Sequence, residues 1–354
     1  MRICLINPTR LIRRPISEMA RMMTEKGHTV SILTPEGNSG LHHETYLENI
    51  TIHTYEVWEP SNTQEWPVPK PGFSAKVEKI SQEHDILHSW THFYLSALLL
   101  AWKKPHNHIV TLDTVPGESF STGWLIDKAF YVFNRTLGKW ILNRATKVTI
   151  YSDELRKSLE RIGYSKEPAV TPTGVIVPEK TNQPELPEEY IAFIGLITER
   201  KGIDRVLDIA RRMPDTTFLI AGDSPERKKW ENKAPENATF LGKIDYVPSL
   251  LDEARCLLLP SRGEGLPGVV MEAMAMRCPV VASDISCIPD LIPDDAYGFL
   301  VKQDDISAYV EAIHTLKSRS IQEDLAEAAY KRITTNFSWE KSVETFLCVY
   351  RGVL

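Results

Sequence analysis

The chain has 354 residues, of which 42% are hydrophobic and 25% are charged, and its formal net charge at pH 7 is -6. This length favours two domains over one, and the acidic balance provides no global positive field to attract nucleic acid. An anionic ligand must therefore be held by local cations or backbone amides. No signal peptide precedes the first strand, and no run reaches the ~18 apolar residues of a membrane span, so we expect a cytoplasmic protein.

The first half of the chain alternates short apolar runs with amphipathic stretches, which is typical of a parallel sheet covered by helices. We expect strands at 2–7, 28–34, 50–57, 85–90, 108–113 and 147–152, and helices ending near Lys26 and at 73–82, 93–103, 124–144 and 153–162. The proline-rich stretch from Trp58 to Pro71 is predicted to be a long loop. Residues 1–172 thus form one predicted Rossmann-like domain.

A proline-rich polar segment at 173–189 is the predicted linker to a second domain, 190–336. Its expected strands are 190–195, 217–223, 238–244, 255–261 and 278–284. The final segment, 337–354, repeats apolar residues at helical spacing and needs a surface to bury them. The five cysteines are odd in number and lack metal-ligand spacing, so we expect reduced, buried thiols.

The segment SRGEGLPGVVMEAMA, residues 261–275, carries the clearest chemical signal. Gly265 and Gly268 let the backbone approach a ligand, and Pro267 suits the first position of a helix. The amides of Leu266 to Val269 then lie at the positive end of the helix dipole, where anions bind. The sequence therefore predicts a diphosphate site at the start of this helix.

Two glutamates lie seven residues apart in this segment. Ionised carboxylates only accept hydrogen bonds, so Glu264 suits the hydroxyls of a sugar and Glu272 suits the two hydroxyls of a ribose. The alternative is that Glu264 complements the helix dipole and Glu272 is a solvated helix residue.

These elements together resemble the retaining glycosyltransferases of family four. The resemblance covers essentially the whole chain. It rests on the segment 264–272 followed by CPVVASD, on IGLITERKGIDRVLDIA at 194–210, on AGD at 221–223, on FLGKI at 240–244 and on the terminal FSWE. The order of these motifs along the chain is also that of the family.

The resemblance implies the GT-B architecture, an α/β fold with two tandem Rossmann-like domains facing a cleft and a C-terminal helix that crosses back to the first domain. It implies a hexose transfer from a UDP- or GDP-linked sugar to a glycan or lipid-linked acceptor in glycoconjugate or polysaccharide synthesis. The reaction would retain configuration and need neither a metal nor another cofactor. The first domain would bind the acceptor and the second the nucleotide sugar.

The resemblance also assigns roles in the second domain. Lys201, with Arg200 beside it, would contact the donor diphosphate, and Glu264 the transferred sugar. Gly242 and Lys243 would contact the base, Glu272 the ribose, and Gly195 would lie against the donor.

Three departures from the family pattern concern charge and backbone approach. Leu196 stands where the family often has an arginine, so Arg200 or the basic loop Arg10, Arg13 and Arg14 can supply the replacement cation, although such a loop is commonly just solvated. The loop NPTRLIRRP lacks the usual glycine pair. Asp113 stands where many members have a histidine; it can accept a sugar hydroxyl, or it can cap the turn that follows.

On the acceptor side, His88 and His92 follow another strand of the first domain and, with Arg13, are the expected acceptor contacts. Residues 123–147 combine aromatic and basic side chains and can lie on an anionic membrane surface at the inner face of the membrane. The alternative is a helix that is apolar because it is buried.

Two other functions remain open from the sequence. A sugar-nucleotide epimerase of the same architecture would need no acceptor, and a noncatalytic nucleotide-sugar binding subunit would bind without turnover. The absence of Gly-x-Gly-x-x-Gly after either first strand argues against a dinucleotide oxidoreductase.

Overall fold

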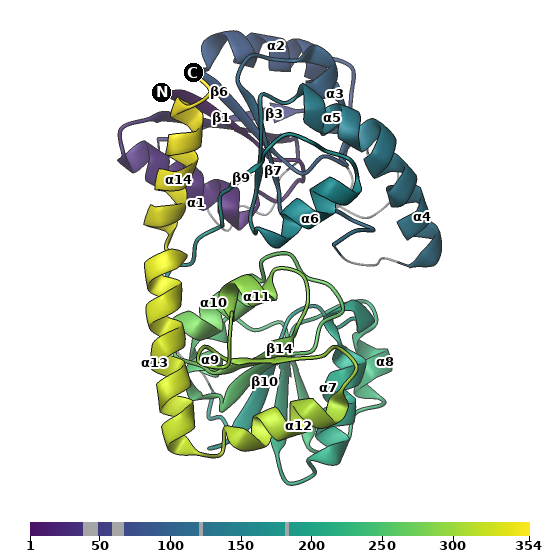
Figure 1. Cartoon of the computed structure of the whole chain (residues 1–354), viewed down its shortest axis with the longest axis vertical. Coiled ribbons are helices and arrows are strands. Elements are labelled where there is room, and N and C mark those ends of the chain that lie inside the picture. The colour runs from purple at the N-terminus through teal and green to yellow at the C-terminus, as the bar shows by residue number, and fades with distance from the viewer. Residues whose placement is uncertain (38–48, 59–66, 120–122, 181–183) are drawn as a thin grey trace. The chain divides into compact units, whose positions relative to one another are not determined.

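The computed structural model describes residues 1–37, 49–58, 67–119, 123–180 and 184–354. The chain forms two compact units. The first comprises Met1–Glu118, Gly123–Gly174 and Trp339–Leu354, and the second comprises Val175–Ser338 with the short segment at Ser119. Both units are drawn in Figure 1.

The first unit is built on a seven-stranded parallel sheet with the strand order β3-β2-β1-β6-β7-β8-β9. Five of these strands are completely or almost completely buried, as expected for a sheet covered on both faces. Its strands are β1 (Arg2–Ile6), β2 (Thr29–Pro35), β3 (Thr51–Tyr55), β6 (Ile86–Trp90), β7 (His108–Leu112), β8 (Lys147–Ile150) and β9 (Ala169–Val170). Its helices are α1 (Arg14–Glu25), α2 (Phe73–Glu83), α3 (Leu95–Lys103), α4 (Trp124–Phe133), α5 (Lys139–Arg144), α6 (Glu154–Arg161) and α14 (Trp339–Arg351).

The second unit has a six-stranded parallel sheet with the order β12-β11-β10-β13-β14-β15. Its strands are β10 (Tyr190–Ile194), β11 (Thr217–Ala221), β12 (Ala238–Gly242), β13 (Cys256–Leu259), β14 (Val280–Ser283) and β15 (Phe299–Val301). Its helices are α7 (Ile203–Arg212), α8 (Arg227–Glu231), α9 (Val247–Glu253), α10 (Gly268–Ala275), α11 (Ile288–Leu291), α12 (Ile306–Thr315) and α13 (Arg319–Asn336), with a 3-10 turn η3 at Glu199–Lys201.

In both sheets the strand order reverses beside the first strand, because later strands are added on both sides of it. β1 lies between β2 and β6, and β10 lies between β11 and β13. In open parallel sheets, ligands bind outside the carboxyl ends of the strands at this reversal. The topology therefore predicts ligand binding at the loops after β1 and β6 in the first unit and after β10 and β13 in the second.

The C-terminal helix α14 belongs to the first unit, whereas α13 before it belongs to the second. Helix α14 packs beside α1, and its apolar stripe of Trp339, Val343, Phe346, Leu347 and Tyr350 is buried (Figure 1). At Gly174 an added Cβ would lie 2.5 Å from the Cα of Trp339, so only glycine permits this contact.

Some local features differ from the sequence expectation. The predicted loop from Trp58 to Pro71 contains two short strands, β4 (Val57–Trp58) and β5 (Val68–Pro69), which pair antiparallel; residues 59–66 lie outside the described residues. Strands β9 and β15 are only two and three residues long, too short for periodicity to reveal. Four cysteines are buried as expected, but Cys348 is exposed.

The predicted helix 124–144 is interrupted by a π-helical turn, Asn134–Gly138. Among the described residues, no helix has both the length and the apolar character that crossing a bilayer requires.

Three buried histidines predict how the first unit responds to acid. Burial lowers the pKa of His92 and His108 to about 4 and holds the pKa of His88 well below its usual range. Because an unfolded histidine takes up a proton near pH 6.5 and these three do not when folded, the unfolded state binds more protons below that pH. We therefore expect the stability of this unit to fall as pH drops from about 6.5 to about 4.

The loss of stability in acid can be measured as the midpoint temperature of thermal unfolding at a series of pH values. In His108→Gln, which keeps a polar partner for Ser89 Oγ 2.9 Å away but cannot take up a proton, the decline should be shallower. An unchanged slope would contradict the assignment to buried histidines.

Candidate active site

The best-defined polar site in the second unit lies at the carboxyl ends of β10 and β13. The Nζ atom of Lys201, in the turn after β10, is 2.7 Å from both carboxylate oxygens of Glu264, in the loop after β13. Glu264 Oε1 also accepts a hydrogen bond of 2.6 Å from Ser261 Oγ. Lys201 is partly buried and Glu264 almost fully buried, so the pair is held with little freedom. The structure thus brings together two of the predicted catalytic residues.

Gly202 allows these two loops to meet. Its φ is +78°, and an added Cβ would lie 2.1 Å from the carbonyl oxygen of Pro260. The Thr198 side chain accepts a hydrogen bond from the Lys201 amide and closes the 3-10 turn η3 before Gly202. Helix α7 then starts directly after the glycine.

Arginines on both loops brace the site. Arg200 Nη1 donates to the Gly263 carbonyl at 2.9 Å, and the Arg262 amide donates to the Arg200 carbonyl at 2.8 Å. Arg262 forms a two-pronged ion pair with Asp204 on α7, at 2.7 and 2.6 Å. Burial alone would raise the pKa of Asp204, but the hydrogen bonds and charge of Arg262 outweigh it and lower that pKa. Arg200 therefore supports the loop that carries Glu264.

The start of α10 has the features expected for anion binding. The helix begins at Gly268, after Pro267, and no side chain caps it. A Cβ added to Gly268 would have no atom within 4 Å, so the space beside this backbone is open. Leu266 is buried beneath the loop, Gly265 and Val269 are partly exposed, and Glu272 lies one turn into the helix, half-buried. The amide groups and Glu272 thus share one end of one helix.

Three predicted donor contacts lie along the same edge of the sheet. Gly195 follows β10, Gly242 ends β12, and the exposed Lys243 comes next. Gly222, which follows β11 between them, has φ +136°, and its added Cβ would lie 1.8 Å from the Gly195 carbonyl oxygen. Its amide donates to the Gly242 carbonyl at 2.8 Å. Leu196, at the departure from the family pattern, is exposed.

In the first unit, Asp113 forms an ion pair with Arg13. Asp113 follows β7, and Arg13 comes immediately before α1 in the loop after β1. The charge of Asp113 raises the pKa of the Arg13 guanidinium, against the opposing effect of burial. The negative charge of Asp113 is therefore balanced locally by a residue that is also predicted to contact the acceptor.

His88 and His92 are core residues, which corrects the prediction that they contact an acceptor. Both are fully buried. His88 lies inside β6; its Nδ1 bonds the hydroxyl of Tyr350 at 2.6 Å, and its Nε2 bonds Thr111 Oγ1. His92 Nε2 bonds Asn134 Oδ1 at 2.8 Å. β6 ends at Trp90, so His88 lies within the strand, and His92, which follows the strand, is buried as well.

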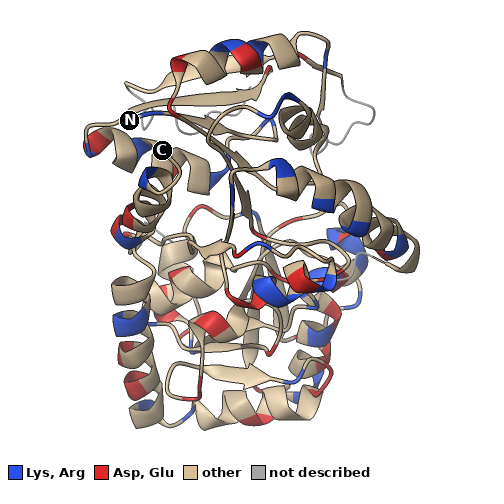
Figure 2. Ribbon diagram, turned by 45° about the horizontal axis from the view of Figure 1, so that its top comes forward, with Lys and Arg blue, Asp and Glu red and all other residues tan. Residues whose placement is uncertain are grey.

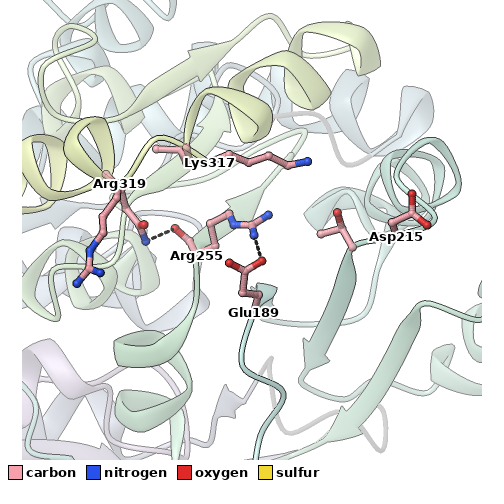
Figure 3. Close-up of a pocket in the computed structure, with 8 residues that line it drawn as sticks. Glu189, Asp215, Arg255, Lys317 and Arg319 are labelled. Carbon is pink, nitrogen blue, oxygen red and sulfur yellow. Dashed lines mark hydrogen bonds and ion pairs between the residues drawn. The ribbon is translucent and has the colours of Figure 1, made fainter.

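A pocket of about 600 Å³ lies elsewhere in the second unit. Its lining residues Glu189, Asp215 and Arg255 come just before β10, β11 and β13, so it lies at the amino ends of the strands (Figure 3). Arg255 is occupied by an ion pair with Glu189, and Lys317 and Arg319 line the same pocket. The sheet topology places ligand binding at the opposite edge.

Sequence reasoning missed three contributors to the candidate site. Ser261 holds the Glu264 carboxylate, and its position three residues earlier in SRGE was a usable signal. The Arg262–Asp204 pair joins residues 58 apart, which no local pattern indicates. Gly202 was included in a motif but its packing against Pro260 was not foreseeable.

Comparison with known proteins agrees with the fold. The family description "Glycosyltransferase Family 4" matches residues 14–177, and "Glycosyl transferases group 1" matches residues 188–319. The N-acetyl-alpha-D-glucosaminyl L-malate synthase of Bacillus anthracis is 23% identical over 366 residues, covering 96% of this chain and 93% of that protein. The alpha-D-kanosaminyltransferase of Streptomyces kanamyceticus is 28% identical over 188 residues, and the alignment spans about half of each chain, 48% and 49%.

Among solved structures, Anabaena HepE in complex with UDP-glucose superimposes with a TM-score of 0.78 at 16% identity, covering 99% of this chain and 100% of that chain. This likeness shows that both chains share the GT-B fold of two Rossmann-like domains. The two family matches together cover most of the chain. The protein therefore belongs to the group 1, family 4 glycosyltransferases.

Proposed function

We propose that this glycosyltransferase moves a hexose from a UDP- or GDP-linked sugar to a glycan or lipid-linked acceptor, with retention of configuration and without a metal. The observation that carries the proposal is the Lys201–Glu264 pair beside the uncapped start of α10, at the sheet reversal. A structural relative is bound to UDP-glucose. The site thus offers a cation and amides for a diphosphate and a carboxylate for a sugar.

In this proposal Lys201 exchanges partners when the donor binds. Without donor, its ammonium is neutralised by Glu264. A diphosphate between Lys201 and the amides of 265–269 would share that ammonium and leave Glu264 free to accept from sugar hydroxyls. As the sugar leaves, negative charge grows on the diphosphate, and fixed donors stabilise it most at that moment. Arg200 acts as a second cation or, through Gly263, as a support for the loop.

The remaining donor residues bind the nucleoside. Glu272 takes the ribose hydroxyls, and Gly242 and Lys243, with Gly195 on the neighbouring strand, lie against the base. At Gly195 an added Cβ would meet no atom within 4 Å, so the backbone there is open to a ligand, whereas the Arg227 guanidinium lies beside Gly242. In the first unit, Asp113 accepts a hydroxyl while Arg13 orients it. Asp113→Asn should slow transfer and leave nucleotide affinity nearly unchanged.

The donor class can be identified by thermal stability in the presence of UDP, GDP, ADP and dTDP, with their common sugars and with NAD as a control. A ligand at ~100 times its dissociation constant adds about 2.7 kcal/mol to the stability of the folded state. We expect one nucleotide to raise the unfolding temperature of the wild type and to fail in Lys201→Ala. Lys317→Ala, in the pocket at the opposite edge, is the matched control and should respond as the wild type does.

If Lys201→Ala keeps the nucleotide-induced rise in unfolding temperature and Lys317→Ala loses it, the nucleotide binds at the amino ends of the strands. That result would overturn the proposed donor site at Lys201. Nucleotide binding without transfer to any acceptor would favour a binding subunit, and modified sugar nucleotide without acceptor would favour an epimerase.

A further inference from the structure

We propose that helix α4 docks on an anionic lipid surface. The outward side of α4, called here the α4 face, consists of Trp124, Leu125, Lys128, Tyr131 and Val132. Trp124 is 68% exposed, Leu125 71% and Val132 60%, and α4 has no buried residue. Contiguous exposed apolar surface of this kind marks an interaction site. The inference deepens the proposed function, since it concerns where a lipid-linked acceptor is met.

The opposite side of α4 packs against the first unit, whereas the α4 face is exposed. Phe130 lies edge-on to Phe93, and Phe133 stacks on His92. Residues three apart share a helix face, so these two rings hold one side of the helix against the first unit. The helix is thus apolar on two sides, of which only one is covered.

The structure also narrows the segment 123–147 suggested by the sequence. After the π-helical turn at 134–138, Ile141 and Leu142 of α5 are buried, and Trp140 packs against the cluster of Ala97, Ala101 and Ile141. The extra residue in a π turn changes the face that follows. α5 is therefore apolar because it is buried, whereas α4 presents its apolar side chains to solvent.

Charge favours an anionic bilayer over a second copy of the chain. Residues 124–135 contain two cations, Lys128 and Arg135, which lie beside rings of the α4 face, and one acid, Asp127, although the whole chain has a formal net charge of -6. In Figure 2 this segment is mostly tan with blue turns. Two copies meeting at α4 would bring like charges together, whereas anionic headgroups would complement them.

Two pairs of an aromatic ring and a cation at the α4 face also suit an anionic bilayer. Lys128 Nζ lies 4.0 Å from the centre of the Trp124 ring, and the Arg135 guanidinium lies 3.6 Å from that of Tyr131. Each pair combines an amphipathic ring with a cation, the combination found on helices that lie in the interfacial region of a membrane. Arg135 is also paired with Glu118, so the more available cation is Lys128.

The test is flotation of the purified full-length protein with vesicles of phosphatidylcholine alone and vesicles that also contain phosphatidylglycerol. We expect the protein to float with the anionic vesicles and to be released by salt. Leu125→Glu/Val132→Glu should abolish flotation, and Lys128→Glu should weaken it on the order of tenfold at low salt. Trp102→Glu, which alters a tryptophan that is 72% exposed on α3, is the matched control and should float as the wild type does.

No flotation of the wild type with anionic vesicles would overturn the proposal, as would equal loss in Trp102→Glu. A dimer in light scattering that Leu125→Glu/Val132→Glu dissociates would assign α4 to a protein interface instead. The unfolding temperature and nucleotide-induced shift of the double variant should match the wild type. These controls separate failure of docking from failure of folding or of the proposed donor site.

Discussion

Replacing Glu264 by glutamine is expected to slow sugar transfer by a factor of about 10² to 10³ while tightening the binding of the bare nucleoside diphosphate. The carboxylate lies 2.7 Å from Lys201 Nζ at both oxygens, so it competes with a diphosphate for that ammonium. Glutamine keeps the shape and loses the charge, which frees Lys201 for the anion. The acceptor for the sugar hydroxyls is weakened at the same time.

The slower transfer is measured as an initial rate. The tighter nucleotide binding is measured by calorimetry, with the nucleotide that the thermal shift identifies. Lys201→Ala should behave differently, because it loses nucleotide affinity as well as rate. Glu327→Gln is a matched control, since Glu327 is also paired, with Arg277 at 2.9 Å, but lies on the exposed side of α13. Wild-type turnover in Glu264→Gln or Glu264→Ala would remove the proposed sugar contact.

Gly202→Ala is expected to destabilise the protein strongly. A Cβ there would lie 2.1 Å from the Pro260 carbonyl oxygen, and φ at this position is +78°. A backbone oxygen cannot move aside as a flexible side chain can, so the loops after β10 and β13 must separate. Steric overlap and a left-handed backbone together should cost about 3 kcal/mol or more.

Gly268→Ala provides the matched comparison, because an added Cβ at Gly268 meets no atom within 4 Å and its backbone is compatible with alanine. We expect its unfolding midpoint in urea to be unchanged or higher, with any defect confined to donor binding. Gly202→Ala should lose both stability and donor binding, since the same movement separates Lys201 from Glu264. Equal stability of the two variants would show that the loop contact at Pro260 is not needed.

Much of the fold was predictable because its sheets are parallel and buried. The apolar runs that form strands such as β1, β7 and β13 are short and uninterrupted, and segments with helical periodicity separate them. The alternation of strands and helices can therefore be recognised from a single sequence. The loop carrying Glu264 was predictable for a related reason, since glycine and proline have distinctive backbone preferences that indicate a turn before a helix.

The contacts that shape the site were less predictable. Arg13 and Asp113 are 100 residues apart, and His88 and Tyr350 are 262 apart, so their pairing depends on strand order and on the return of α14. His88 lies inside the expected strand 85–90, and its burial comes from partners on distant elements, so the prediction that it contacts an acceptor was wrong. The π turn after α4 likewise decided which apolar residues are buried.

The most direct test of the account is nucleotide release from the identified donor in the presence of a lipid extract or glycan mixture, comparing the wild type with Glu264→Gln. We expect release by the wild type to require acceptor and to yield a glycosylated product. Glu264→Gln should bind the donor but release nucleotide at least ~10²-fold more slowly. Equal release by both proteins, or a converted sugar nucleotide with no acceptor product, would contradict transfer at the Lys201–Glu264 site.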